Sequence, residues 1–207
     1  MGRKKNDPAI RKMDFVRAAE ELFSEQGLDR VSIKDIAGRV GVTHAAFFYY
    51  YRSKDQIFED VVTFHLGKYE KMVKDLVADN SLSAVEKLQA MLDTAMGLSR
   101  NDNLFIKYLH ADGNASIHKK YVERSHMIFI PLLTEIVEQG INEGTIDLAY
   151  PKETVEFMIH IFDSLDEFRY MSWENKDYYR KTRALEAILS RTLKLQDGTL
   201  QCNIKHS

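Results

Sequence analysis

The fold is decided by residues 32–51, which read SIKDIAGRVGVTHAAFFYYY. Ser32 can cap a short helix with apolar residues on one face, and Gly41 then permits a tight turn. Thr43 can cap a second short helix, on which Phe47 faces back toward the first. The stretch therefore predicts a helix-turn-helix whose second helix presents its opposite face to the outside.

Helical patterns continue on both sides of this stretch, and the alternation typical of strands is nearly absent. A capping box at Ser83–Glu86 opens one of the later helices, and Pro131 predicts a kink or a break in another. We expect an all-α chain, with a polar, disordered tail after residue 195. The remaining helices are predicted at residues 8–26, 53–78, 83–99, 102–112, 116–139, 151–173 and 175–195.

The charge of the 207-residue chain is unevenly distributed. Residues 1–54 hold 11 Lys and Arg against 7 Asp and Glu, whereas residues 55–207 hold 18 against 24. A basic head on an acidic body favours a polyanionic partner for the head. The single cysteine, Cys202, excludes a disulfide framework. No apolar run is long enough to span a bilayer or serve as a signal peptide, so we expect a soluble, cytoplasmic protein that does not contact membranes.

Four short segments together resemble the TetR family of bacterial transcriptional repressors. They are Phe15–Gly27, Val31–Ala37, Gly41–Thr43 and Ser53–Lys54, which match in residue type, order and spacing. The resemblance implies a helix-turn-helix DNA-binding domain over residues 9–62 and a helical effector-binding and dimerisation domain over residues 63–195. Residues 196–207 form the polar tail.

The resemblance also implies which side chains meet DNA. Thr43 resembles the residue that caps the recognition helix and meets a phosphate, and His44 begins the base-reading positions. In place of the family's usual Gly, Tyr, His and Phe, this chain has Ala45, Phe48, Tyr50 and Tyr51. A palindromic double-stranded operator is the expected partner. The predicted DNA contacts are Ser32, Lys34, Thr43, His44, Ala45, Ala46, Tyr49, Tyr50 and Lys54.

Two late helices offer apolar residues for an interface. The helix at residues 152–172 has apolar residues on two sides, and a helix of this kind must bury both of them. A four-helix bundle across a two-fold axis would do so, as the resemblance also suggests, although both helices can instead lie deep within one subunit. The predicted homodimer interface is Phe157, Ile161, Phe168, Leu185, Ile188 and Leu189.

The middle of the body is rich in Met, Phe, Tyr and His. Such side chains can line an adaptable apolar pocket, although they fill ordinary cores more often. We expect an unidentified small apolar or amphipathic effector that releases the repressor from its operator. The predicted ligand contacts are His65, Met91, Phe105, Tyr108, His126, Phe129, Phe162 and Asp166.

Two other classes of function remain as alternatives. Glu123 and His126 form half of the paired motif found in di-iron bundles, but a second pair is absent from the sequence. No phosphate loop, zinc-protease motif or nucleophile elbow occurs, so we predict no catalytic residue, metal site or cofactor. A helical protein-interaction module with a degenerate head is the stronger rival to the repressor.

Overall fold

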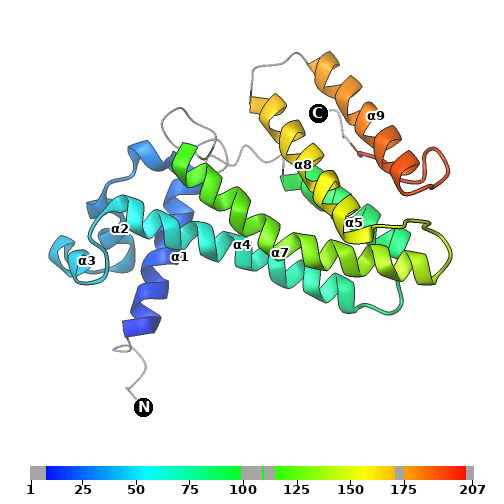
Figure 1. Ribbon diagram of the computed structural model, residues 1–207. Coiled ribbons are helices and arrows are strands. Elements are labelled where there is room, and N and C mark those ends of the chain that lie inside the picture. Colours follow the sequence, from blue (N-terminus) through cyan, green and yellow to red (C-terminus); the bar gives the residue numbers. More distant parts are fainter. Residues whose placement is uncertain (1–7, 99–108, 110–114, 171–174, 204–207) are drawn as a thin grey trace. The chain divides into compact units, whose positions relative to one another are not determined.

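The computed structural model describes residues 8–98, 109, 115–170 and 175–203. Within these ranges every regular element is a helix (Figure 1), which confirms the predicted all-α class. None of the helices described there is long and apolar enough to cross a membrane. The elements are α1 (Pro8–Gln26), η1 (Leu28–Arg30), α2 (Ile33–Val40), α3 (His44–Tyr50), α4 (Lys54–Ala78), α5 (Ala84–Leu98), α7 (Ala115–Asn142), α8 (Pro151–Tyr170) and α9 (Asn175–Thr192).

Contacts within the chain divide it into two compact units. Unit 1 comprises Met1–Tyr69 and Asp102–Tyr121, and unit 2 comprises Glu70–Asn101 and Val122–Ser207. The division of the sequence at residues 62 and 63 into two functional domains stays a prediction. The predicted helix at residues 102–112 lies outside the described residues except for Leu109, which is helical and buried.

Unit 1 is built on a core of aromatic side chains from α1, α3 and α4. Phe15 on α1 and Phe47 on α3 meet edge to face with ring centroids 5.6 Å apart, and both are buried. Phe23 on α1 and Phe58 on α4 form a second such pair. Edge-to-face pairs are favourable beyond the area that they bury. This core fixes α3 against α1 and leaves the far side of α3 outside.

The turn between α2 and α3 follows the sequence prediction. Ser32 caps α2 in a capping box with Asp35, and the hydroxyl of Thr43 accepts a bond from the Ala46 N–H at 3.3 Å to cap α3. Gly41 ends α2 with φ of 76°, in the left-handed region that side chains disfavour. A glycine fits there because only three residues separate the two helices and the first of them adopts this positive φ.

Unit 2 is a helical bundle with one continuous apolar core. Ala84, Leu88 and Leu92 of α5 meet Ile136 and Val137 of α7 in this core. α8 and α9 pack side by side (Figure 1) and complete the bundle. Their buried contributions are Val155, Met158 and Ile159 from α8 and Leu185 and Leu189 from α9.

Polar contacts at one end of unit 2 join α5 to α7. Ser83 and Glu86 form the predicted capping box, and the Glu143 carboxylate accepts from the Ala84 N–H at 3.0 Å. The buried ammonium of Lys87 donates to the carbonyl oxygen of Val77 at 2.7 Å and to Gln139 Oε1 at 2.8 Å. Two acceptors offset part of the cost of taking this charge out of water.

The structure differs from two predictions about chain continuity. α7 runs through Pro131 without a break, so the break is wrong, whereas a kink at Pro131 stays a prediction. One proline removes a single helical hydrogen bond, and here Pro131 and Met127 are exposed so that water can replace the missing donor. Residues 196–203 are not a disordered tail, because Leu200 and Cys202 are buried in the unit 2 core. Gln201 also bonds Gln89 of α5 through its backbone N–H at 2.9 Å and its carbonyl oxygen at 2.8 Å.

Candidate functional site

Helix α3 forms the candidate site, because it is short, capped and exposed on one side. Its inner face contributes the buried Phe47, and its outer face carries Tyr49, which is 79% exposed. His44 and Ala45 are also exposed, whereas Ala46 is half-buried. The outer face therefore offers small side chains at its start and aromatic side chains at its end.

Tyr51 anchors the C-terminal end of α3 to the rest of unit 1. Its ring is buried, and its hydroxyl donates to Asp60 Oδ2 on α4 at 3.0 Å. Burial, with the nearby Asp60 carboxylate, raises the pKa of Tyr51, so the hydroxyl stays protonated and can donate. Lys12 of α1 lies 2.7 Å from the same Asp60 oxygen. Asp60 and Lys12 thus position α3, and the sequence pattern singles out neither of them.

The predicted phosphate residues at the helix N-termini are exposed and act as caps. The hydroxyl of Ser32 donates to Asp35 Oδ2 at 2.6 Å. This hydrogen bond is the main reason why the pKa of Asp35 is lowered. The Ser32 hydroxyl proton is therefore already used within the helix. The Thr43 hydroxyl accepts its capping bond, which leaves its proton available for a further acceptor.

The two predicted phosphate lysines have different surroundings. The ammonium of Lys54 donates to the carbonyl oxygens of Leu28 at 2.8 Å and Val31 at 3.2 Å, and so holds the start of α4 against η1. At most one of its three N–H donors remains for DNA. Lys34 on α2 is exposed. Lys54 is thus first a structural lysine, a role that its place in the motif does not indicate.

The aromatic side chains of α3 are held against one another. Phe48, which replaces the family's usual tyrosine, packs on His44 with ring centroids 5.2 Å apart. Tyr49 and Tyr50 meet at 4.9 Å, and Tyr50 also packs on Phe15 at 5.4 Å. These ring contacts are present within a single protomer, without a bound partner.

The residues predicted to bind a ligand divide between the two units. Met91, Phe129 and Phe162 are half-buried against the core of unit 2. His65 is buried in unit 1, with Nδ1 3.6 Å from Glu20 Oε1. Phe105 and Tyr108 lie outside the described residues, as do the side chains of Asp166 and of Phe168 from the predicted dimer interface.

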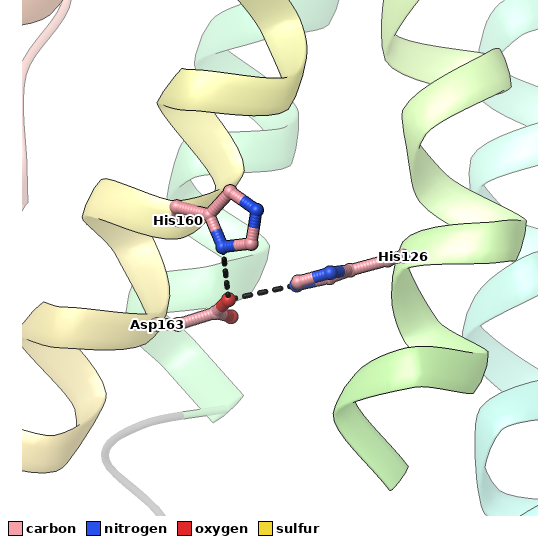
Figure 2. Close-up of side chains that lie close together, drawn as sticks. All are labelled: His126, His160 and Asp163. Atoms are coloured by element: carbon pink, nitrogen blue, oxygen red, sulfur yellow. Dashed lines mark hydrogen bonds and ion pairs between the residues drawn. The ribbon is translucent and has the colours of Figure 1, made fainter. Parts of the chain in front are cut away.

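His126, the remaining predicted ligand residue, is part of a polar cluster in unit 2. Its Nε2 lies 2.7 Å from Asp163 Oδ2 on α8, and His160 Nδ1 approaches the same oxygen at 3.7 Å (Figure 2). The predicted ligand contacts include His126 but neither of its two partners. Their spacing of one turn on α8 is the local signal that joins them in a cluster.

The residues of the predicted dimer interface differ in exposure. Leu185 and Leu189 are each 2% exposed and lie in the core of unit 2, which does not favour a contact with a partner. Phe157 is 71% exposed and Ile188 is 43% exposed. Ile161 is half-buried against the core. Apolar periodicity alone cannot tell which of two faces a helix turns inward.

Two protein-family models match the chain, one in the helix-turn-helix head and one in the helical body. Residues 15–61 match the bacterial regulatory proteins of the tetR family, and residues 98–188 match the tetracyclin repressor-like C-terminal domain. Together the two matches cover more than half of the chain.

Individual relatives are distant in sequence and similar in fold. The HTH-type transcriptional repressor KstR2 of Mycolicibacterium smegmatis is 27% identical over 90 residues, which span 42% of this chain and 42% of KstR2. A TetR-family regulator of Pectobacterium atrosepticum superposes with a TM-score of 0.74 at 14% identity, over 92% of this chain and 98% of that one. Thermus thermophilus FadR, solved in complex with lauroyl-CoA, has a TM-score of 0.62 at 19% identity, over 95% and 96%.

The capped, exposed α3 on a helix-turn-helix head, followed by a helical body, defines a DNA-binding transcriptional regulator. The chain belongs to the TetR family of bacterial regulatory proteins. That family consists of regulators rather than enzymes, so the helical-bundle enzyme is set aside.

Proposed function

We propose that this regulator is a homodimeric repressor that binds a two-fold symmetric operator and leaves it when a small molecule binds the body. The observation that carries the proposal is α3, whose outer face is exposed while Thr43 caps its N-terminus. A helix N-terminus with free N–H groups and a hydroxyl donor suits a backbone phosphate. Residues 9–62 would serve as the DNA-binding domain and residues 63–195 as the effector and dimerisation domain.

Individual roles within the head follow from chemistry and exposure. Thr43 and Lys34 would contact phosphates, which carry no sequence information. Ser32 would act mainly as the cap of α2, because its hydroxyl and its backbone N–H both donate to Asp35. His44 would read base edges, with Ala45 and Ala46 leaving room for close approach and apolar contact. Tyr49 and Tyr50 would meet sugar and phosphate. Lys54 would add at most one phosphate bond, because two carbonyl oxygens already bind its ammonium.

Exposed apolar residues on the last two helices support dimerisation. Phe157 and Ile188 are large apolar side chains with much of their surface in solvent. Burying them against the same residues of a second copy would give a two-fold interface. Two copies of α3 would then bind two half-sites, which compensates for the few base contacts of one short helix.

The effector would be a small apolar or amphipathic molecule bound in the body. Met91, Phe129 and Phe162 offer adaptable apolar contacts, since they are half-buried rather than locked in the core. FadR of Thermus thermophilus, which has a similar fold, holds lauroyl-CoA, an amphipathic ligand. Release from DNA requires the effector to bind the DNA-free conformation more tightly than the DNA-bound one.

Selection from random double-stranded DNA tests the operator claim. The full-length protein should enrich a palindrome with two half-sites about one helical turn apart. On that sequence, His44→Ala should cost about 1–3 kcal/mol per half-site and leave random-DNA binding unchanged. Lys34→Ala should weaken both kinds of DNA and lower the slope of log K against log salt by about 1 per lost contact.

Lys71→Ala is the matched control, because Lys71 is an exposed lysine on α4 paired with Asp75. It should bind DNA as the wild type does. Failure to enrich any sequence, with the fold intact by circular dichroism, would favour the interaction-module alternative. The effector claim is tested separately, by thermal-shift screening of a metabolite library followed by operator titration with each compound that binds. A binder that leaves operator affinity unchanged is not an inducer.

A further inference from the structure

The polar cluster on α7 and α8 has the composition of a metal site. His160 and Asp163 lie one turn apart on α8, and His126 approaches them from α7, so that all three side chains converge (Figure 2). One nitrogen from each histidine and one oxygen from Asp163 lie within 4.8 Å of one another. All three residues belong to unit 2.

The spacing of these three atoms fits a single small ion. A tetrahedral ion bound to nitrogen and oxygen at about 2.0–2.2 Å separates its ligand atoms by about 3.3 Å. The distance from Asp163 Oδ2 to His126 Nε2 is 2.7 Å and to His160 Nδ1 is 3.7 Å, which bracket that value.

The surroundings also favour a bound ion with an open coordination position. The side chain of His126 is 16% exposed and that of Asp163 is 35% exposed, whereas His160 is 65% exposed. An ion could therefore enter from the side of His160 and lose part of its hydration on the other side. Asp163 lies between the two histidines, at hydrogen-bond distance from His126 and in a longer ion pair with His160.

We propose that His126, His160 and Asp163 bind one divalent transition-metal ion, with Zn²⁺ as the best-suited ion. Two imidazoles and one carboxylate favour late first-row metals over Mg²⁺ and Ca²⁺, which prefer oxygen ligands alone. Three protein ligands leave a fourth position for water or for a donor atom of a bound molecule. This site replaces the prediction of no metal ligands, and it does not depend on the proposed function.

Calorimetric titration of the full-length, tag-free protein with ZnCl₂ tests the site. We expect one ion per protomer and a dissociation constant in or below the micromolar range. His160→Ala and Asp163→Asn should each weaken binding by more than the roughly 10–100-fold that changes around metal ligands cost. His118→Ala is the matched control, because His118 lies on the same helix two turns away from His126, and it should bind Zn²⁺ as the wild type does.

Cobalt provides a readout that reports on the ligands directly. Co²⁺ bound to the wild type and to His118→Ala should give visible d–d absorption bands that Zn²⁺ abolishes by displacement, and His160→Ala should lack them. His160 is exposed, so its substitution leaves the core unchanged and serves if His126→Ala does not fold. The proposal is overturned if neither ion binds at micromolar concentration, or if His160→Ala and Asp163→Asn bind both ions as the wild type does.

Discussion

His65 on α4 is a titratable residue buried inside unit 1. Burial lowers the pKa of His65 below 6.5, against the opposing influence of Glu20 and with a smaller contribution from Lys68 in the same direction. Tyr69 covers the ring at a centroid distance of 5.1 Å. The folded chain therefore holds this imidazole neutral at a pH where the unfolded chain protonates it.

We expect the unfolding free energy to fall as the pH drops below about 6.5, because the unfolded state then binds a proton that the folded state excludes. The contribution of His65 is fully present above that pH and is lost toward acid. Melting temperatures of wild type and His65→Gln between pH 7.5 and 5 should show a shallower loss for the variant. His44→Gln, an exposed histidine of the same unit, is the control and should follow the wild type. Equal slopes in all three proteins would contradict the assignment.

At the scale of the elements, Lys54 connects the first turn of α4 to η1. Its ammonium bonds two carbonyl oxygens that lie 26 and 23 residues earlier in the chain. Truncation removes both charge-assisted bonds and leaves two carbonyl oxygens without this donor. We therefore expect the loss of Lys54 to lower the stability of the head in addition to any loss of DNA binding.

Lys54→Ala should lower the stability of the protein by about 1–2 kcal/mol, measured by urea denaturation. Lys34→Ala removes an exposed lysine from the same head and should change stability by no more than about 0.5 kcal/mol. If the two variants denature at the same urea concentration, the carbonyl contacts of Lys54 contribute nothing measurable.

The helices and their caps were predictable from local sequence, whereas several side-chain roles were not. Thr43 and Ser83 act within four residues of their partners, so spacing alone identifies them as caps. Lys54 bonds carbonyls distant in sequence, and no local pattern reveals that choice. The polar composition after residue 195 concealed Leu200 and Cys202, because two apolar side chains suffice to fix a short segment on a core.

At the scale of the whole molecule, the exposed apolar side chains bear on assembly. Phe157 lies on α8 and Ile188 on α9, and these two helices pack together. Large apolar side chains exposed on neighbouring helices favour association with a second copy. The described residues leave these two side chains in solvent within a single protomer.

Phe157→Asp combined with Ile188→Asp should convert the dimer into a monomer. In a two-fold interface both copies carry each substitution, so every new carboxylate would be buried without a partner of opposite charge. Light scattering on the eluting protein at micromolar concentration measures the mass. Met72→Asp changes another exposed apolar residue of unit 2 and should remain dimeric. A wild-type monomer under these conditions, or a double variant that still dimerises, would rule this interface out.

The insertion of the C-terminal segment into unit 2 makes the chain's one thiol a natural reporter of that unit. Cys202 is 5% exposed, its backbone N–H donates to Glu186, and burial raises the pKa of its thiol to about 12. Alkylation requires an accessible thiolate, so iodoacetamide can react only after residues 196–203 detach from α5 and α9. The labelling rate therefore measures how often this segment opens. An effector that tightens the body should slow labelling without any engineered probe, and Leu200→Ala, which removes a neighbouring anchor, should speed it.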